Sequence, residues 1–135
     1  MRTCLVGSEM CIRDRLAHRW LSAELLEPIQ RDGGLMWVSV DLCIVPIGVG
    51  VSLSPYVAAC ERVIAATGLT HQLGPNGTAI EGPWEEVMAC VRACHVELHG
   101  MGAARLYTTL KLNTRTDRQQ SFSEKVASVQ QLLGD

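Results

Sequence analysis

The stretch Val38-Ser39-Val40-Asp41-Leu42-Cys43-Ile44-Val45 decides the fold. Its even-numbered residues are all apolar, whereas Ser39, Asp41 and Cys43 lie at odd-numbered positions. Successive side chains of a strand point to opposite faces of a sheet, so this period of two predicts a strand with one buried face. We expect Pro46 and the Gly48-Val49-Gly50 stretch to end the strand.

The residues after this strand predict alternating helices and strands. Ser54-Pro55 is typical of a helix start, Gly68 of a helix end, and Gly74-Pro75-Asn76-Gly77 of a turn between strands. The expected elements are a helix from Ser54 to Gly68, strands over Thr70–Leu73 and Thr78–Glu81, a helix that opens at Gly82-Pro83 and ends at Gly100, and a strand over Arg105–Leu112.

A last helix is expected after this strand. Ser121-Phe122-Ser123-Glu124 has the spacing of a capping box, and the residues expected to be buried behind it are Phe122, Val126, Val129 and Leu133. The order is then βαββαβ with a trailing helix. This order predicts an α+β, ferredoxin-like sandwich, in which two helices cover one face of a four-stranded antiparallel sheet.

Length and composition limit the function classes. The chain has 135 residues, a size typical of one domain, and its formal charge is −2. No run of Lys and Arg is present, so we expect no nucleic-acid partner. No apolar stretch approaches the length of about 18 residues that indicates a membrane span, so we expect no membrane partner.

The first 35 residues are expected to lie outside the folded domain. Residues 4–15, with Glu-Met-Cys-Ile-Arg-Asp as their core, resemble a translated sequencing-library adapter. Residues 16–35 are interpreted as translated upstream sequence, with a native helical arm as the alternative. The domain boundaries that we predict are therefore a non-native or disordered leader over 1–35 and a ferredoxin-like domain over 36–135.

Two motifs that suggest cofactor chemistry are better explained without it. Gly48-x-Gly50 lacks the third glycine of a dinucleotide fingerprint, so we interpret it as a ligand-gating or interface loop. Cys90, Cys94, His95 and His99 lie on one helix, but no second ligand cluster accompanies them. We expect no metal and no cofactor.

The face of the sheet opposite the helices is predicted to be open and polar. The side chains expected to project from it together are those of Asp41, Glu81, Arg105, Thr109 and Lys111. Asp41 and Glu81 suggest a paired-carboxylate acid–base system, a neutralised ion network with the two cations, or a site for a cationic ligand. A small sheet with one open face also favours association of copies of the chain.

A family resemblance spans about 100 residues from Met36 onward. Its motifs are Val40-Asp41 through Pro46-Ile47-Gly48, Ser54-x-Tyr56-Val57, Gly74-Pro75-Asn76-Gly77-Thr78-Ala79-Ile80-Glu81-Gly82, Trp84-Glu85-Glu86-Val87, Met101-Gly102-Ala103-x-Arg105, Thr108-Thr109-x-Lys111, Arg115, Asp117 and Lys125-Val126. In these motifs the chain resembles the small cytosolic thiamine-binding proteins. The loop Val49–Leu53 is more apolar than is typical of them.

The resemblance implies a ferredoxin-like dimer or tetramer that binds thiamine or hydroxymethylpyrimidine without catalysis. The ligand-binding residues that it implies are Ser52, Ser54, Asn76, Gly77, Thr78 and Glu81, with Asp41 and Thr109 as second choices. Glu81 would pair with the positive charge of thiamine or accept a hydrogen bond from the pyrimidine amine. Tyr56 or Tyr107 would stack on a ring of the ligand. Arg105 and Lys111 would join subunits or hold an anion.

Three function classes are consistent with the sequence. They are a carrier, store or sensor of thiamine or a related pyrimidine, an oligomeric structural or regulatory module without a small ligand, and an enzyme that uses Asp41 and Glu81. The first is the predicted function. Cys43, Cys60, Cys90 and Cys94 all lie on expected strands or helices, which argues against a disulfide framework and favours the cytoplasm.

Overall fold

The structure, a computed structural model, describes residues 36–134. The chain divides at the same point into two units, Met1–Leu35 and Met36–Asp135. The predictions of an adapter-like segment over 4–15 and of a non-native or disordered leader over 1–35 lie outside the described residues.

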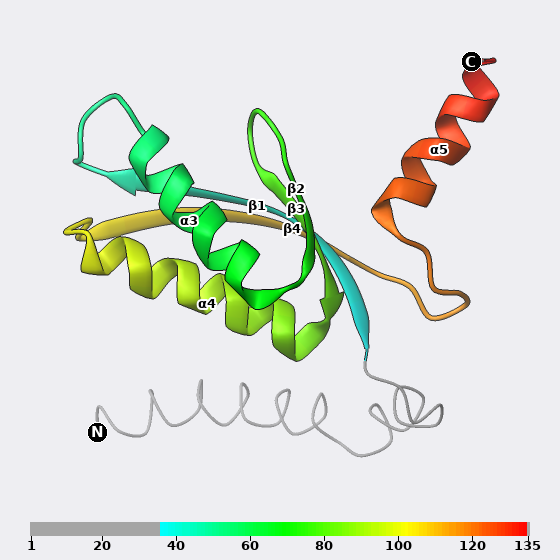
Figure 1. Ribbon diagram of the computed structural model, residues 1–135, viewed down its shortest axis with the longest axis horizontal. Helices are drawn as coiled ribbons and strands as arrows, with labels where there is room; N and C mark the ends of the chain where they lie inside the picture. The colour runs from blue at the N-terminus through cyan, green and yellow to red at the C-terminus, as the bar shows by residue number, and fades with distance from the viewer. Residues whose placement is uncertain (1–35, 135) are drawn as a thin grey trace, which may run out of the picture. The chain divides into compact units, whose positions relative to one another are not determined.

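The described part of the chain follows the expected order of strands and helices (Figure 1). Its elements are β1 (Trp37–Ile47), α3 (Ser54–Thr67), β2 (Thr70–Leu73), β3 (Thr78–Pro83), α4 (Trp84–Gly100), β4 (Arg105–Thr114) and α5 (Phe122–Leu133). The strands form one antiparallel sheet in the order β2-β3-β1-β4. The predicted α+β, ferredoxin-like fold is confirmed.

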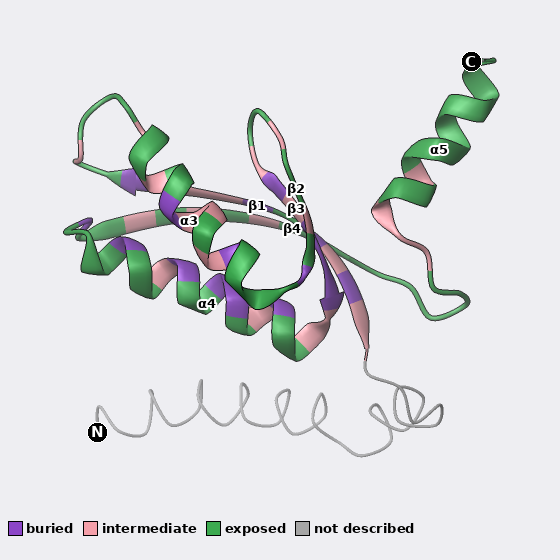
Figure 2. Cartoon of the chain, viewed as in Figure 1, coloured by how far each residue is buried: buried purple, intermediate pink, exposed green. Residues whose placement is uncertain are grey.

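β1 lies inside the sheet and pairs on both sides. Val40 is opposite Ile80 of β3 on one side and Leu112 of β4 on the other. The alternation in β1 sends Val38, Val40 and Leu42 into the core, where α3 and α4 cover them (Figures 1 and 2). The predicted buried face of this strand is therefore confirmed.

β1 continues through Pro46 to Ile47, two residues beyond the predicted end. Beyond Leu42, β4 is the one strand paired with β1 in the described residues. Proline donates no backbone hydrogen bond and is tolerated where a strand has a free edge. The expectation that Pro46 ends the strand was wrong because this half of β1 has such an edge.

Helix boundaries agree closely with the capping signals. Gly68 ends α3 in the left-handed conformation, with φ 73°. Ser121 caps α5, and it forms both hydrogen bonds of the capping box with Glu124. α4 begins at Trp84 rather than at Pro83, which is its N-cap. None of the helices in residues 36–134 is long and apolar enough to cross a membrane.

The expectation that α5 is a core helix was wrong. No residue of α5 is buried, and Val126 and Val129 are each 56% exposed (Figure 2). α3 and α4 already cover the apolar face of the sheet, and the connection after Thr114 carries α5 away from both (Figure 1). The apolar period of α5 predicted the helix correctly, but a period does not identify what the apolar stripe packs against.

Two Val→Ala substitutions test this difference between helices. Val87 of α4 is 0% exposed, and Val129 of α5 is 56% exposed. We expect Val87→Ala to lower the free energy of unfolding by about 1–3 kcal/mol, because it removes buried methyl groups and leaves a cavity. Val129→Ala makes the same change in helix propensity and should cost less than about 0.5 kcal/mol. Urea unfolding of both variants measures the difference, and equal losses would contradict the solvent-exposed position of α5.

Candidate functional site

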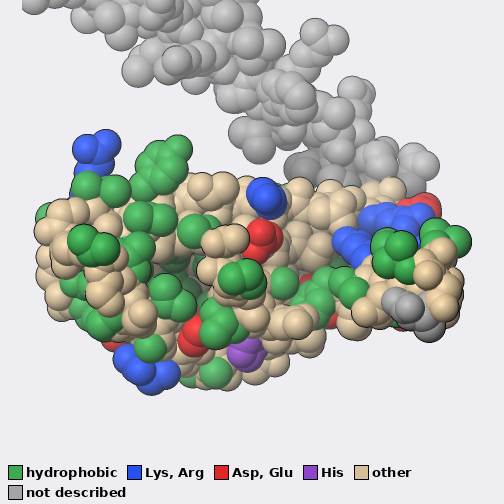
Figure 3. Space-filling view, turned by 90° about the horizontal axis from the view of Figure 1, so that it is seen from above, with side chains coloured by type: hydrophobic (Ala, Val, Ile, Leu, Met, Phe, Trp, Pro, Cys, Tyr) green, Lys and Arg blue, Asp and Glu red, His purple; other side chains and the backbone are tan. Residues whose placement is uncertain are grey.

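A groove of about 980 Å³ lies between α3, the second half of β1 and the turn that joins β2 to β3. Its floor contains Leu42, the last residue of β1 that pairs with β3, and Cys43, Ile44 and Val45, which have no paired strand on that side among the described residues. Hydrophobic side chains gather over this part of the molecule in the space-filling view (Figure 3). A concave and largely apolar site of this size is typical of small-molecule binding.

Local turn chemistry builds the two walls of the groove. Leu53 accepts hydrogen bonds from the backbone N–H groups of Tyr56 and Val57, which starts α3 at one wall. In the β2–β3 turn, Gly74 N–H donates to the carbonyl oxygen of Gly77 at 2.8 Å. A Cβ at Gly77 would lie 2.6 Å from Asp41 Oδ1 and 3.1 Å from the carbonyl oxygen of Leu42, so glycine lets this turn approach β1 without displacing the Asp41 side chain.

Among residues 36–134, Glu61 is the one charged side chain that lines the groove. Thr78 Oγ1, which is buried on β3, donates a hydrogen bond of 2.5 Å to Glu61 Oε1. The described residues place no hydrogen-bond donor on Oε2 of the same carboxylate. The groove therefore presents a positioned negative charge in an apolar setting, which is the arrangement that a cationic ligand requires.

The structure brings four of the eight predicted ligand-binding residues together. Ser54, Asn76, Gly77 and Thr78 line the groove from its two walls. Ser52 lies in the exposed loop before α3, and Asp41 reaches the rim of the groove at Gly77. Four of the eight predicted positions therefore line the groove, and the role of all eight in binding stays a prediction.

Glu81 and Thr109 lie on the open face of the sheet, away from the groove walls. Glu81 pairs in register with Ser39, and Thr109 with Cys43. Glu81 is only 5% exposed, and its Oε2 accepts a hydrogen bond of 2.9 Å from the backbone N–H of Phe122. This carboxylate therefore holds the start of α5 in the structure.

The predicted open polar face is present. Asp41 lies opposite Lys111 in the β1–β4 register, and Arg105 and Tyr107 lie further along the same face of β4. Tyr107 is 66% exposed, whereas Tyr56 is half-buried on α3. Neither tyrosine lines the groove, and the apolar side chains that line it are aliphatic, apart from Pro75 and the cysteines.

Sequence reasoning did not single out Glu61 as a ligand-binding residue. The signal was present, because Glu61 lies four residues after Val57 and three before Ile64, inside the apolar stripe of α3. Charged residues are rarely buried without a partner, so a glutamate in such a stripe indicates a polar contact across the interface. The partner, Thr78, is 17 residues away in the sequence.

The cysteines and histidines on α3 and α4 form local contacts rather than a shared cluster of metal ligands among the described residues. Cys43, Cys60, Cys90 and Cys94 are free thiols, which agrees with the argument against a disulfide framework. His95 Nε2 is 2.8 Å from Thr108 Oγ1, and His99 Nδ1 is 2.7 Å from the carbonyl oxygen of Ala103. Within residues 36–134, no three His, Cys, Asp or Glu side chains are grouped as metal ligands.

The thiols at the α3–α4 interface differ in acidity. Cys94 Sγ donates a hydrogen bond of 4.0 Å to the backbone carbonyl oxygen of Cys60, and the neighbouring Cys94 side chain lowers the pKa of the Cys60 thiol. Side-chain hydrogen bonding, chiefly with Cys60, and burial raise the pKa of Cys94. Cys60 lines the groove, so the more acidic thiol of this pair is also the more accessible one.

A family model described as thiamine-binding protein matches residues 40–130. The UPF0045 protein sll0230 of Synechocystis sp. is 53% identical over 98 residues, which cover 73% of this chain and 81% of that protein. The UPF0045 protein ECM15 of Eremothecium gossypii is 41% identical over 97 residues, which cover 71% of this chain and 92% of the relative.

Solved structures share the fold. A hypothetical protein from Methanocaldococcus jannaschii, MJ1052, superposes with a TM-score of 0.66 at 24% identity, over 70% of this chain and 97% of its own. A candidate thiamine biosynthesis/salvage protein from Thermotoga maritima, TM0486, superposes with a TM-score of 0.60 at 25% identity, over 69% of this chain and 98% of its own.

Alkylation of the full chain tests the positions of the thiols. We expect iodoacetamide at neutral pH to modify Cys60 before Cys90 and Cys94, because Cys60 lines the groove and the other two are 1% and 0% exposed. Mass spectrometry of the digested protein measures each rate. In denaturant the three rates should become similar, and modification of Cys94 before Cys60 in the folded protein would contradict this arrangement.

Proposed function

Because the chain belongs to the thiamine-binding protein family, we propose that its groove binds thiamine or the related hydroxymethylpyrimidine. The observation that carries this proposal is the Glu61 carboxylate, held by Thr78 in an otherwise uncharged groove. The match to a thiamine biosynthesis/salvage candidate from Thermotoga maritima is consistent with the same ligand class.

The two rings of thiamine require different surroundings. The thiazolium carries a positive charge, which favours a carboxylate such as that of Glu61. The aminopyrimidine needs hydrogen-bond donors and acceptors, and Asn76 offers an amide and Ser54 a hydroxyl in the same groove. Ile44, Val57 and Leu73 provide apolar surface for the ring faces.

We propose that this binding involves no catalysis. A paired-carboxylate mechanism requires two accessible acidic groups that face one substrate. Glu81 is buried and already accepts a hydrogen bond from Phe122, so it does not act as the second acid of a pair with Asp41. A carrier, storage or sensor role is therefore preferred, and the free thiols favour the cytoplasm as its location.

We further propose that the protein is a homo-oligomer, a dimer or a tetramer. The open face of the sheet exposes Tyr107 and also carries a cross-strand Asp41–Lys111 pair, four residues further along β4. α5 adds exposed apolar side chains, among them Leu132 at 88%. Apolar surface of this kind is typical of interaction sites, and it keeps an oligomeric interaction module without a ligand as the alternative function.

Substitution of Glu61 tests the ligand site. We expect calorimetry of the full chain to detect thiamine binding, and Glu61→Gln to weaken it roughly 10- to 100-fold, because it removes the negative charge that attracts the thiazolium in a largely apolar groove. The neutral hydroxymethylpyrimidine should lose much less affinity, because it lacks the cationic ring.

Glu81→Gln is the matched control for this experiment. The same chemical change is made there, but the side chain lies outside the groove and can still accept from Phe122. Its thiamine affinity should equal that of the unsubstituted protein. Absence of binding heat with thiamine and with hydroxymethylpyrimidine would contradict the proposed function. A larger loss of thiamine affinity in Glu81→Gln than in Glu61→Gln would indicate that thiamine binds at the open face instead.

Sedimentation tests the oligomer. We expect a mass of two or four times the 14.7 kDa protomer, and we expect Tyr107→Arg to reduce it by placing an unpaired charge in the interface. Ala93→Arg introduces the same charge on the exposed side of α4 and should leave the mass unchanged. A monomeric unsubstituted protein would contradict this part of the proposal.

A further inference from the structure

A second, smaller pocket lies where β1 begins and β4 ends. The residues that line it, here called the basic pocket, are Trp37, Ser39, Asn113, Arg115, Arg118, Gln119, Gln120 and Lys125. None of them lines the groove, which lies at the other end of β1. Three of the eight are cationic, and none is acidic.

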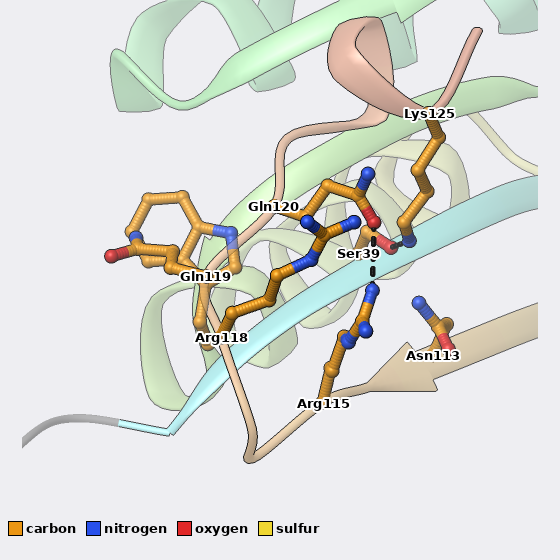
Figure 4. A pocket seen from close by; sticks show the side chains of 8 residues that line it. Ser39, Asn113, Arg115, Arg118, Gln119, Gln120 and Lys125 are labelled. Atoms are coloured by element: carbon orange, nitrogen blue, oxygen red, sulfur yellow. Dashed lines mark hydrogen bonds between the residues drawn. The ribbon is translucent and has the colours of Figure 1, made fainter. Parts of the chain in front are cut away.

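The cations of the basic pocket come from separate segments of the chain. Arg115 directly follows β4, Arg118 lies in the connection to α5, and Lys125 lies on the first turns of α5. Figure 4 shows their charged groups extending toward the same space beside Ser39 and Gln120. The fold of the β4–α5 connection therefore concentrates positive charge over the sheet.

The hydrogen-bond donors of the pocket are only partly used. Arg115 donates hydrogen bonds from Nε and one terminal nitrogen to Asp117, and from the other terminal nitrogen to Gln120. Two of its five N–H groups remain without an acceptor in the described residues. Lys125 Nζ gives one hydrogen bond, of 3.2 Å, to Ser39 Oγ. Arg118 makes no hydrogen bond and no ion pair within residues 36–134.

Trp37 is the clearest sign of a missing acceptor. Its indole Nε1–H is buried and is the one buried side-chain polar atom without a partner in the described residues. Such groups are rare in native structures, because an unmade hydrogen bond costs about 1–3 kcal/mol, and they often mark the place of a water or an ion. The side chain that carries this donor lines the basic pocket.

Neighbouring carboxylates leave the positive charge of the pocket uncompensated. The Arg115 guanidinium lowers the pKa of Asp117 to about 2, so this carboxylate stays ionised and balances Arg115. Glu81 accepts from Phe122 N–H, and Glu124 accepts from Ser121 N–H. The charges of Arg118 and Lys125 have no carboxylate partner in the described part of the chain.

The size of the pocket limits the ligand. Its volume is about 20 Å³, and its mouth is open to solvent. A space of this size holds roughly one water-sized group. A single oxygen of a tetrahedral oxyanion fits inside, with the other oxygens at the mouth among flexible cationic side chains.

We propose that the basic pocket binds a phosphate-type oxyanion, either the free ion or a phosphoryl group on a small molecule. Arg118 and Lys125 supply the charge, and Trp37 supplies a buried donor. The bound anion links β1 to the β4–α5 connection and so fastens α5 to the sheet, which α5 otherwise contacts through Glu81 and Ser39. This site does not depend on the ligand of the groove.

Nuclear magnetic resonance of the full chain, labelled with ¹⁵N, tests this site. The sequence has three tryptophans, so three indole signals are expected, and Trp37→Phe identifies that of Trp37. Titration with inorganic phosphate at constant ionic strength should shift the Trp37 signal to saturation. In the Arg118→Gln/Lys125→Gln double variant, the affinity should fall at least tenfold. Arg92→Gln, an exposed cation on α4, should bind as the unsubstituted protein does.

Three results of this titration would contradict a phosphate site at Trp37. No shift of Trp37, an equal shift with chloride alone, or an undiminished affinity in the double variant would overturn it. A parallel titration with glycerol 3-phosphate identifies the source, since saturation by the ester assigns a phosphorylated small molecule and saturation by phosphate alone assigns the free ion. Phosphate should also slow amide hydrogen exchange in residues 122–133, and unchanged exchange there would overturn the fastening of α5.

Discussion

The pairing of β1 with a strand on each side is the constraint on which the rest of the structure depends. Val40 and Leu42 have neighbours in β3 and in β4, so this half of β1 has no free edge. The same two side chains belong to the core beneath α3 and α4. Because the side-chain period of a strand is two, a shift of β1 by one residue would move its apolar side chains to the open face.

The groove arises where that double pairing ends. β3 leaves β1 at Leu42, but β4 continues to Ile47, so the second half of β1 keeps one uncovered edge. α3 and the β2–β3 turn flank this edge without closing it. The turn approaches β1 as closely as it does because Gly77 has no side chain to meet Asp41. A candidate ligand site is therefore a consequence of unequal strand lengths and one glycine.

Local patterns in the sequence predicted the elements, but not the contacts between distant residues. The alternation in β1 and the capping box at Ser121 depend on neighbouring residues, so both were predictable. Glu61 and Glu81 are different, because their partners lie 17 and 41 residues away. Strand parity placed Glu81 on the correct face, but only the path of the chain after β4 brings Phe122 to it. The exposure of α5 has the same cause, since the position of that helix depends on the connection after Thr114.

Negative and positive side chains lie at opposite ends of β1, so one small ligand would not contact both. The groove contains a single carboxylate beside the end of β1, whereas the basic pocket lies at its start and contains three cations. Ser39 of the basic pocket and Leu42 of the groove are separated by roughly 10 Å along the strand, at about 3.3 Å per residue. Their side chains also point to opposite faces of the sheet. The cation site proposed for the groove and the proposed oxyanion site therefore lie on opposite faces of β1, and we expect each to be occupied independently of the other.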